Sequence, residues 1–237
     1  VQNVINTSIF EHKRSLEKLG VPVDKTEWLM SPNTVNAYYN PVFNEIVFPA
    51  AILQFPFFDF NADDAINYGG IGAVIGHEMT HGFDDQGCQY DEAGYLKNWW
   101  LPEDAKLFAK RTATVVNQFD LYTVLNGSVH VNGSLTLGEN IADLGAYEAF
   151  KKTKQGQRQE KIDGFTPDQR FFLSWAQIWR NKATDAMARQ LIETDNHSPG
   201  EWRCNGPLSN FEPFYKAFNV KEGNKMFVPV EKRAKIW

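Results

Sequence analysis

The feature that most constrains this chain is the stretch from Val74 to Asp85, which contains the pattern H-E-x-x-H at His77, Glu78 and His81. Residues four positions apart lie on the same face of an α-helix, so the two imidazoles can bind one metal ion while Glu78 lies beside them. Two neutral ring nitrogens at this spacing suit zinc, and the adjacent carboxylate suits a base acting on a metal-bound water. The pattern therefore predicts a zinc site on a helix.

The alternative is a surface helix that carries two unrelated histidines. The apolar residues Ile71, Val74 and Ile75 indicate that the helix is buried instead, and buried histidines beside a buried glutamate need partners, of which a metal is one. We therefore predict a zinc-binding helix over residues 66–85. Four glycines lower its helix propensity, which indicates that another element approaches it closely; they are Gly69, Gly70, Gly72 and Gly76.

The composition is that of an ordinary globular protein, with 43% hydrophobic and 22% charged residues among 237, enough for one large domain or two small ones. With a net charge of −5 and no basic run, nucleic acid is not an expected partner. The longest apolar stretch, 46–58, is interrupted by Pro49 and Pro56 and is too short to span a bilayer. The first residue, Val1, predicts a processed product, a fragment or a designed chain.

Hydrophobic periodicity, turn residues and capping residues predict the remaining elements. Helices are expected over residues 2–19, 102–125, 136–154, 167–183, 186–194 and 208–218, strands over 35–39, 44–48 and 129–131, and loops over 151–161 and 197–203. No internal repeat or convincing domain boundary is visible, so residues 1–237 are expected to form one domain. Many helices with few strands indicate an α+β fold that is mainly α.

A hydrolytic zinc site needs a third protein ligand besides the two histidines, and the best candidate is Glu139. Asp143 lies one helical turn after Glu139 and is well placed to hold a ligand histidine by its other ring nitrogen. Asp84 has the same geometry relative to His81 on its own helix. The alternatives are a solvated acidic face for Glu139 and Asp143, and a surface acid at a helix end for Asp84.

Further stretches occur in the order and spacing of one family of peptidases. The chain resembles the catalytic part of a neprilysin-like metallopeptidase, within the gluzincin class, over residues Val35–Tyr39, Glu45–Phe58, Asn67–Gly87, Gly138–Asp143, His197–Gly200 and Arg203. These residues are spread over most of the chain. The resemblance implies a thermolysin-like zincin architecture, in which a helix-rich lobe and a small β-sheet flank a central H-E-x-x-H helix.

The resemblance also implies roles for the charged residues. One zinc ion would be ligated by His77, His81 and Glu139, and Glu78 would be the general base that activates a zinc-bound water. His197 would stabilise the oxyanion together with the zinc. Asp84 and Asp143 would orient the two ligand histidines, which makes Asp143 part of the catalytic set.

The substrate-binding residues are likewise implied by the resemblance. Asn36 and Ala37 would bind the peptide backbone from the hairpin edge, and Arg203 would grip a substrate carbonyl. The apolar pocket after the scissile bond would be lined by Ile52, Phe57, Val74 and Trp179. From the residues alone, Phe57 and Trp179 are more typical of a plain core, and a sheet edge packed on the core is as probable as a peptide-binding edge.

The predicted function is that of a zinc-dependent endopeptidase that prefers an apolar residue after the scissile bond. The alternatives are a zinc aminopeptidase, which needs an upstream acidic exopeptidase motif that is not found, and a peptide-binding protein that has lost catalysis. Peptides are the expected partners. The helical lid domain that precedes this region in family members is not found in this sequence, which predicts a more open cleft.

The two cysteines, Cys88 and Cys204, are too few for a disulfide framework. Free thiols are expected, and a single bridge is the alternative if their Cα atoms lie within about 7 Å. Ala234 stands where animal members of the family have a cysteine, which favours a bacterial member. The resemblance predicts a secreted or cell-envelope location, with a cytoplasmic bacterial location as the alternative.

Overall fold

The computed structural model describes residues 1–144, 157 and 160–236. The second half of the predicted helix 136–154 and most of the predicted loop 151–161 lie outside the described residues. Contacts between Cα atoms separate the chain into two units, residues 1–31 and residues 32–237. Each unit is described by itself below.

The first unit consists of helix α1 (Gln2–Glu17) and the segment that follows it. The helix ends two residues earlier than predicted, and Gly20 has the positive φ of 79° that glycine adopts most readily. None of the residues of α1 is buried. Its C-terminal end is tied to the following segment by Arg14 and Lys18, which both pair with Glu27.

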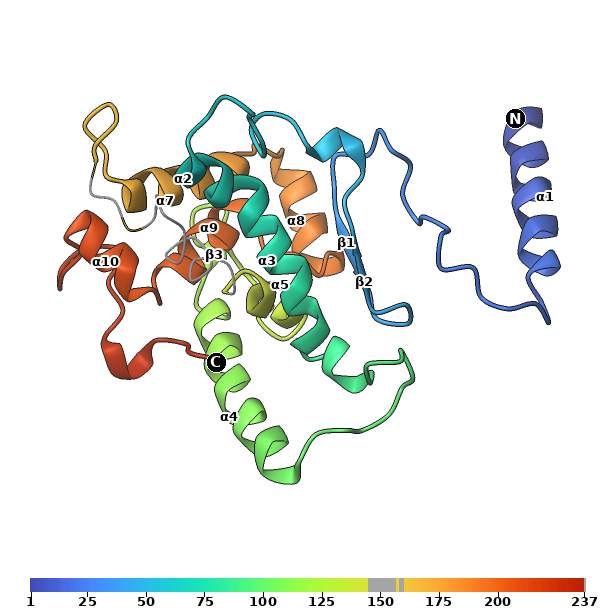
Figure 1. Cartoon of the computed structure of the whole chain (residues 1–237). Coiled ribbons are helices and arrows are strands. Elements are labelled where there is room, and N and C mark those ends of the chain that lie inside the picture. The colour runs from blue at the N-terminus through green and yellow to red at the C-terminus, as the bar shows by residue number, and fades with distance from the viewer. Residues whose placement is uncertain (145–156, 158–159, 237) are drawn as a thin grey trace. The chain divides into compact units, whose positions relative to one another are not determined.

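The second unit is built around the helix that carries the H-E-x-x-H pattern (Figure 1). Its backbone is helical from 64 to 83, as α2 (Asp64–Asn67), the π-helical turn η2 (Tyr68–Gly72), α3 (Ala73–Thr80) and the 3-10 turn η3 (His81–Phe83). Asp63 caps the N-terminus, because its side chain accepts a hydrogen bond from the backbone N–H of Ala65. The helix ends before Asp84, whose backbone is extended, so the predicted end at 85 is two residues too late.

The glycines of this helix allow two neighbouring segments to approach it. A Cβ atom on Gly69 would collide with the backbone carbonyl oxygen of Phe171, and one on Gly70 would collide with that of Phe57. Phe171 belongs to helix α7 (Pro167–Ile178). The predicted close approach of another element is therefore confirmed at these two positions, where any larger residue would push the neighbouring backbone away.

Two separate hairpins replace the single small sheet that was expected. Strand β1 (Tyr38–Asn40) pairs antiparallel with β2 (Glu45–Val47), with Tyr38 opposite Val47, and β3 (Thr123–Val124) pairs with β4 (Val129–His130). The first hairpin starts three residues later than predicted, so Asn36 and Ala37 precede the sheet instead of belonging to it. The expected α+β fold class, mainly α, is confirmed, and so is its zincin-like architecture.

Among the described residues, the other helices of the second unit are α4 (Pro102–Phe119), α5 (Leu137–Ala142), α7, α8 (Asp185–Thr194), α9 (Gly200–Leu208) and α10 (Glu212–Phe218). Short 3-10 turns are η1 (Ala50–Ile52), η4 (Gly87–Gln89) and η5 (Val230–Lys232). Helix α4 ends six residues earlier than predicted, because the chain turns into the second hairpin at Thr123. Helix α7 ends at Ile178, not at residue 183.

The predictions around residue 200 need correction. The expected loop over 197–203 is partly helical, because α9 already begins at Gly200 after Pro199. The single helix expected over 208–218 is instead the end of α9 followed by α10. Pro213 accounts for the break: it occupies the first turn of α10, where its missing N–H is harmless, whereas inside a continuous helix its ring would clash with the preceding turn.

Three clusters of buried apolar side chains hold the second unit together. The largest surrounds α7, α9 and α10, the second lies between α4, α5 and α9 and includes Ala234 and Ile236, and the third joins Ala37 and Ile52 to α3. Helix α3 contacts α5 and both strands of the first hairpin, which places the H-E-x-x-H pattern where these elements meet (Figure 1).

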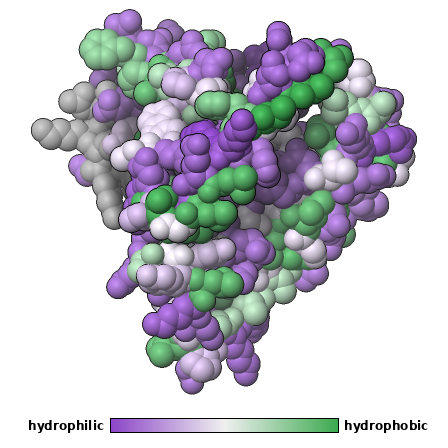
Figure 2. All heavy atoms as spheres, turned by 90° about the vertical axis from the view of Figure 1, so that its right-hand side faces the viewer, coloured by the Kyte–Doolittle hydropathy of each residue, from purple (hydrophilic) through white to green (hydrophobic). Residues whose placement is uncertain are grey.

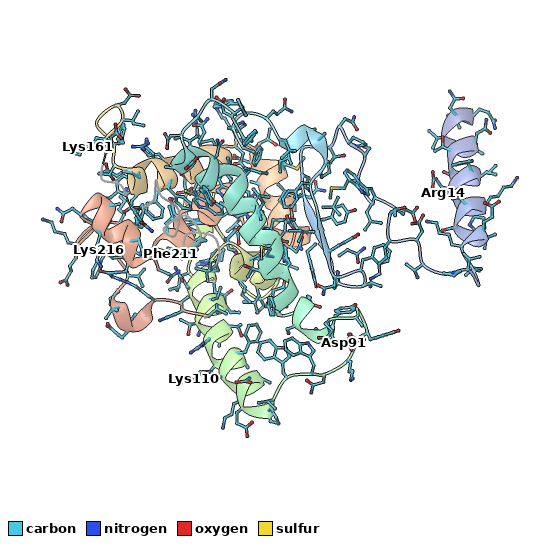
Figure 3. The ribbon with its side chains drawn as sticks, viewed as in Figure 1. Arg14, Asp91, Lys110, Lys161, Phe211 and Lys216 are labelled. Carbon is cyan, nitrogen blue, oxygen red and sulfur yellow. The ribbon has the colours of Figure 1, made fainter. Side chains whose placement is uncertain are left out.

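The surface carries both charged and hydrophobic side chains. Charged side chains such as Lys110 on α4 and Lys216 on α10 project away from the body of the second unit (Figure 3). Hydrophobic residues form separate patches among hydrophilic ones on the face drawn in Figure 2. No helix among the described residues is both long and apolar enough to cross a membrane. Cys88 and Cys204 are free, as expected, the first half-buried and the second buried.

Candidate active site and metal centre

Three potential metal ligands converge from two helices. His77 and His81 come from the end of α3 and the start of η3, and Glu139 comes from α5. One donor atom from each lies within 4.8 Å of the other two. The Nε2 atoms of the two histidines are 3.0 Å apart, and the carboxylate of Glu139 lies 3.3 Å from His77 Nε2 and 3.7 Å from His81 Nε2. Helical spacing brings the two imidazoles together, and the packing of α5 on α3 adds the carboxylate.

The donor set of this cluster calls for a positive charge at its centre. Each histidine turns its Nδ1 toward a carboxylate, which accepts but cannot donate, so the proton of a neutral ring lies on Nδ1. The lone pairs of the two Nε2 atoms then face each other and the Glu139 carboxylate, whose buried Oε2 has no hydrogen-bond partner. A divalent cation satisfies all three groups, and two nitrogens with one carboxylate oxygen are a common zinc set. The residues present therefore fit zinc.

Without a cation, a proton takes over part of this role at His77. Burial lowers the pKa of His77, but the carboxylates of Asp143 and Glu139 outweigh burial and raise that pKa to about 9. Burial also raises the pKa of Glu139, but His77 and Arg203 outweigh burial and lower that pKa below its usual value. The Glu139 carboxyl therefore stays ionised. The cluster thus keeps an anionic ligand and attracts cations.

Each ligand histidine is held by an aspartate. Asp143 Oδ1 lies 2.8 Å from His77 Nδ1, and Asp84 Oδ2 lies 2.7 Å from His81 Nδ1. These contacts have the geometry that their predicted orienting role requires, because a carboxylate on Nδ1 fixes the ring and leaves Nε2 for a metal. Asp84 reaches its histidine although the helix has ended, and its other oxygen accepts from the backbone N–H groups of Gln86 and Gly87.

Arg203 holds the buried charge of Asp143. Its Nε and Nη2 atoms each lie 2.8 Å from a different Asp143 oxygen, a bidentate pair, and Nη2 also lies 3.3 Å from Glu139 Oε2. Burial raises the pKa of Asp143, but Arg203 and His77 outweigh it and hold that pKa well below its usual range. The guanidinium stacks on the ring of Trp179, 4.0 Å from its centre.

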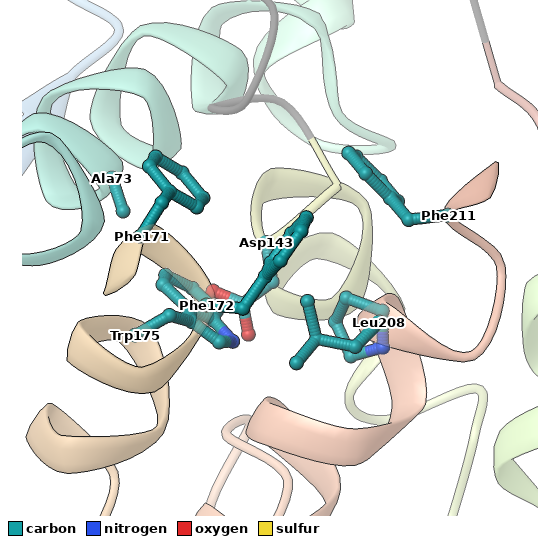
Figure 4. Close-up of a pocket in the computed structure, with 8 residues that line it drawn as sticks. Ala73, Asp143, Phe171, Phe172, Trp175, Leu208 and Phe211 are labelled. Carbon is teal, nitrogen blue, oxygen red and sulfur yellow. The ribbon is translucent and has the colours of Figure 1, made fainter. Parts of the chain in front are cut away.

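The surroundings of Asp143 explain why it depends on this pairing. Behind it lies a cavity of about 20 Å³ with aromatic and aliphatic walls that include Phe171, Phe172, Trp175 and Leu208 (Figure 4). Such a wall offers an ionised carboxylate almost no polar contact, so its charge must be balanced by groups on the other side. Arg203 and His77 provide that balance.

Glu78 lies between the two ligand histidines in sequence and is buried, with 5% of its surface exposed. Burial raises the pKa of Glu78, although the positive charges of His77 and His81 oppose the shift. A carboxyl group whose pKa is shifted toward neutrality can both accept and release a proton. This is the property that a general base needs at this position.

His197 approaches the cluster from the loop before α9. Its Nε2 lies 3.3 Å from Glu139 Oε1, and its side chain is 45% exposed, so it faces both the metal ligands and solvent. Asp195, which the sequence reasoning did not identify, accepts from the backbone N–H of His197 and contacts its Nδ1 at 2.7 Å. The spacing D-x-H is the only signal that could have revealed this contact.

The predicted substrate-binding residues fall into two groups. Ala37, Ile52 and Val74 are buried together in one apolar cluster, against which Phe57 packs, and Asn36 next to Ala37 is exposed. Trp179 belongs to the neighbouring cluster around α7, and Ile178 packs against both clusters. Ile52 is only 2% exposed, so in this structure it is a core residue at the edge of the site.

A helix with two histidines one turn apart, a glutamate between them and a second glutamate from another helix define the class of gluzincin-like metallopeptidase sites. The sequence matches the description "Peptidase family M13" over residues 36–234, and the chain belongs to that family. The predicted neprilysin-like relationship is thereby confirmed.

Proteins of known name and structure agree with this placement. The chain is 46% identical over 243 residues to an endothelin-converting enzyme homolog of Locusta migratoria, covering all of this chain and 33% of that protein. It is 43% identical over 244 residues to neprilysin-3 of Drosophila melanogaster, covering all of this chain and 30% of that protein. The structure of Mycobacterium tuberculosis zinc metalloprotease Zmp1 in complex with an inhibitor matches with a TM-score of 0.93 and 52% identity, over 96% of this chain and 36% of that one. The chain thus spans about a third of the length of these relatives.

Proposed function

We propose that this chain is a zinc-dependent endopeptidase that hydrolyses peptide bonds and prefers an apolar residue after the scissile bond. The observation that carries the proposal is the convergence of His77, His81 and Glu139 on one point, with the buried Glu78 on the same helix. One zinc ion held by these three residues would act as a Lewis acid on the peptide carbonyl and make a water molecule more acidic.

The residues around that point would move the protons of the reaction. Glu78 takes a proton from the attacking water and delivers it to the leaving nitrogen, and its raised pKa suits both steps. Asp195 accepts a hydrogen bond from Nδ1 of His197 and holds the ring so that Nε2 faces the site, where the imidazolium form, with a proton on each ring nitrogen, donates a hydrogen bond to the carbonyl oxygen as negative charge develops. Asp143 and Asp84 keep the two ligand imidazoles in place.

Substrate recognition is assigned to the residues on both sides of this centre. The exposed Asn36 and the backbone of Ala37 bind the peptide chain next to β1, and Arg203, held by Asp143, binds a substrate carbonyl. The apolar cluster of Ile52, Val74 and Phe57 supports the preference for an apolar side chain after the scissile bond, because it lies beside the zinc-binding helix. Trp179 under Arg203 forms the opposite wall.

A direct test combines metal analysis with cleavage of a peptide that is blocked at its N-terminus and carries a leucine or phenylalanine after one bond. We expect about one zinc per chain and cleavage that stops on chelation and returns with zinc. Failure to cleave the blocked peptide while its free-amine form is cleaved would indicate an aminopeptidase. Zinc binding without cleavage of either form would indicate a peptide-binding protein.

Glu78→Gln tests the role of the base with the smallest change of shape. The amide cannot accept the proton, so we expect kcat to fall by roughly 10²–10⁴-fold while zinc content is unchanged. Glu103→Gln on the exposed face of α4 is the matched control and should keep full activity. Near-normal turnover by Glu78→Gln would reject the assignment.

We propose further that a helical lid domain of the kind found in family members would restrict substrate size, so that these 237 residues alone cleave larger substrates than a full-length relative does. The comparison requires one short peptide and one intact protein, each incubated with this chain and with a full-length member of the family. If the rate of peptide cleavage relative to that of protein cleavage is the same for both enzymes, the proposal of a more open cleft is wrong.

A further inference from the structure

A network of buried hydrogen bonds runs beside the proposed active site, and none of its residues has been given a role in the reaction so far. Ser198 Oγ donates to Asn140 Oδ1 at 2.8 Å, and Asn140 Nδ2 donates to Thr136 Oγ1 at 2.9 Å. Thr136 Oγ1 in turn donates to the backbone oxygen of Asn132 at 3.0 Å. Every hydroxyl proton has an acceptor, and Asn140, Ser198 and Thr136 are 0%, 3% and 3% exposed.

This network of hydrogen bonds connects two segments that each carry a proposed functional residue. Asn140 follows the metal ligand Glu139 on α5, and Thr136 is the residue before that helix. Ser198 follows His197 and precedes Pro199, from which α9 and Arg203 begin. The bond between Ser198 and Asn140 thus joins the residue after the proposed oxyanion donor to the residue after the carboxylate ligand.

Among the described residues, the other contacts of the loop that bears His197 are longer or lie within the same segment. The His197 side chain is 45% exposed, and within the loop its backbone N–H and Nδ1 contact only Asp195, two residues earlier, which moves with the same segment. Toward α5, the loop makes two long contacts to Glu139 Oε1, one of 3.3 Å from His197 Nε2 and one of 3.4 Å from Asn196 Nδ2. The short, fully buried Ser198–Asn140 bond is therefore the best-defined tie between the loop and the helix of the metal ligand.

We propose that Asn140 and Ser198 are a positioning pair that sets the place of His197 relative to Glu139 and the reacting carbonyl; this inference rests on the proposed function. The pair touches neither metal nor substrate and acts through His197. A displacement of about 1 Å at a catalytic group can cost on the order of 10²-fold in rate. The hydrogen bond to a buried amide, which cannot be replaced by water, supplies the rigidity that an exposed loop lacks.

Ser198→Ala tests the pair, because it removes only the donor hydroxyl. We expect kcat to fall by roughly 10–100-fold, with KM and the zinc dissociation constant changing by less than about threefold. In a His197→Ala background the same substitution should lower kcat by less than about twofold, since a residue that acts through His197 has nothing left to position. Ser198→Thr, which retains the hydroxyl, should recover most of the activity.

A second measurement, hydrogen–deuterium exchange, tests the same pair without relying on enzymatic activity. Hydrogen–deuterium exchange of the segment 195–199 in the chelated protein should become on the order of tenfold faster in Ser198→Ala, while α5 stays protected. Ser209→Ala is the matched control: Ser209 is also 3% exposed and hydrogen-bonded, but to Gly206, Gln118 and Tyr122. It should reduce thermal stability without changing kcat or exchange in 195–199.

Several outcomes would overturn the proposal. An unchanged kcat in Ser198→Ala, an equally large effect in the His197→Ala background, or unchanged exchange in 195–199 would each do so. If Ser198→Ala does not fold, Thr136→Val interrupts the same chain of hydrogen bonds from its other end, and the same three criteria apply to it. If the unsubstituted chain cleaves no peptide, the proposed function fails, whereas the exchange measurement still decides whether the pair holds the loop.

Discussion

The two aspartates that hold the histidines of the H-E-x-x-H pattern look equivalent, but the two pairs are built differently. His81 and Asp84 are three residues apart, and their side chains remain 17% and 6% exposed. His77 and Asp143 are 66 residues apart and come from different helices, and their side chains are 9% and 0% exposed. One pair is local and partly solvated, whereas the other exists only because α5 packs on α3.

This difference decides how each pair is stabilised. Asp84 accepts hydrogen bonds from the backbone N–H groups of Gln86 and Gly87, which balance its charge locally. Asp143 faces an apolar wall, so it depends on Arg203 for a bidentate ion pair. A local pair can lose its charge at low cost, while a buried remote pair is coupled to the stability of the whole unit.

Asp143→Asn should show the largest difference between the two pairs, which is a loss of folding stability. The substitution removes the bidentate partner of the buried Arg203 and leaves it only the longer contact to Glu139, which should cost about 3–5 kcal/mol of unfolding free energy. Urea unfolding of the chelated protein measures this cost. The double variant Asp143→Asn with Arg203→Met should regain much of the loss, because no unpaired charge remains. If Asp143→Asn is as stable as the unsubstituted protein, the coupling described above is wrong.

Asp84→Asn should have a smaller effect, confined to the metal. Asparagine keeps the Oδ1 acceptor for Gln86 and Gly87 but removes the negative charge next to His81. We expect zinc to bind about 10–100-fold more weakly, with an unfolding free energy lowered by less than about 1 kcal/mol. Competition with a chromophoric chelator gives the affinity. A loss of stability equal to that of Asp143→Asn would remove the distinction between the pairs.

The smallest effect is a pH-dependent release of protons when zinc binds. The pKa of His77 in the metal-free protein is raised to about 9, so at pH 7.5 its ring carries a proton that a metal ligand must lose. Zinc uptake should therefore release about one proton from His77 at pH 7.5 and progressively less as the pH rises through 9. A pH indicator in weak buffer records the release. Release that does not decline between pH 7.5 and pH 10 would contradict the raised pKa.

Much of the site could be predicted from residue spacing. The i,i+4 relation of His77 and His81 and the i,i+3 relation of His81 and Asp84 are local, and the structure shows the corresponding contacts. Glu139 was chosen as the best remote acid, and it does lie next to the imidazoles. Asp195 was missed, because a D-x-H spacing is too common in loops to signal a contact.

Element boundaries were predicted less well, for reasons that lie outside each segment. Helix α4 stops where the chain must enter the second hairpin, and the first hairpin begins only at Tyr38, where pairing with Val47 starts. The expected loop over 197–203 is helical from Gly200 on, because a proline such as Pro199 fits the start of a helix as well as a turn, and the sequence pattern does not distinguish the two. The intrinsic preference of each segment for helix or strand therefore cannot predict these boundaries.

What the residues alone predict about this protein is therefore its chemistry: an H-E-x-x-H helix, a remote glutamate and a metal site between them, since helical geometry relates neighbours in sequence to neighbours in space. The close approach of α7 at Gly69, the burial of Asp143 against an apolar wall and the link from Ser198 to Asn140 are decided by the tertiary structure. They join residues tens of positions apart, and such contacts form only when packing of the apolar clusters brings the segments together.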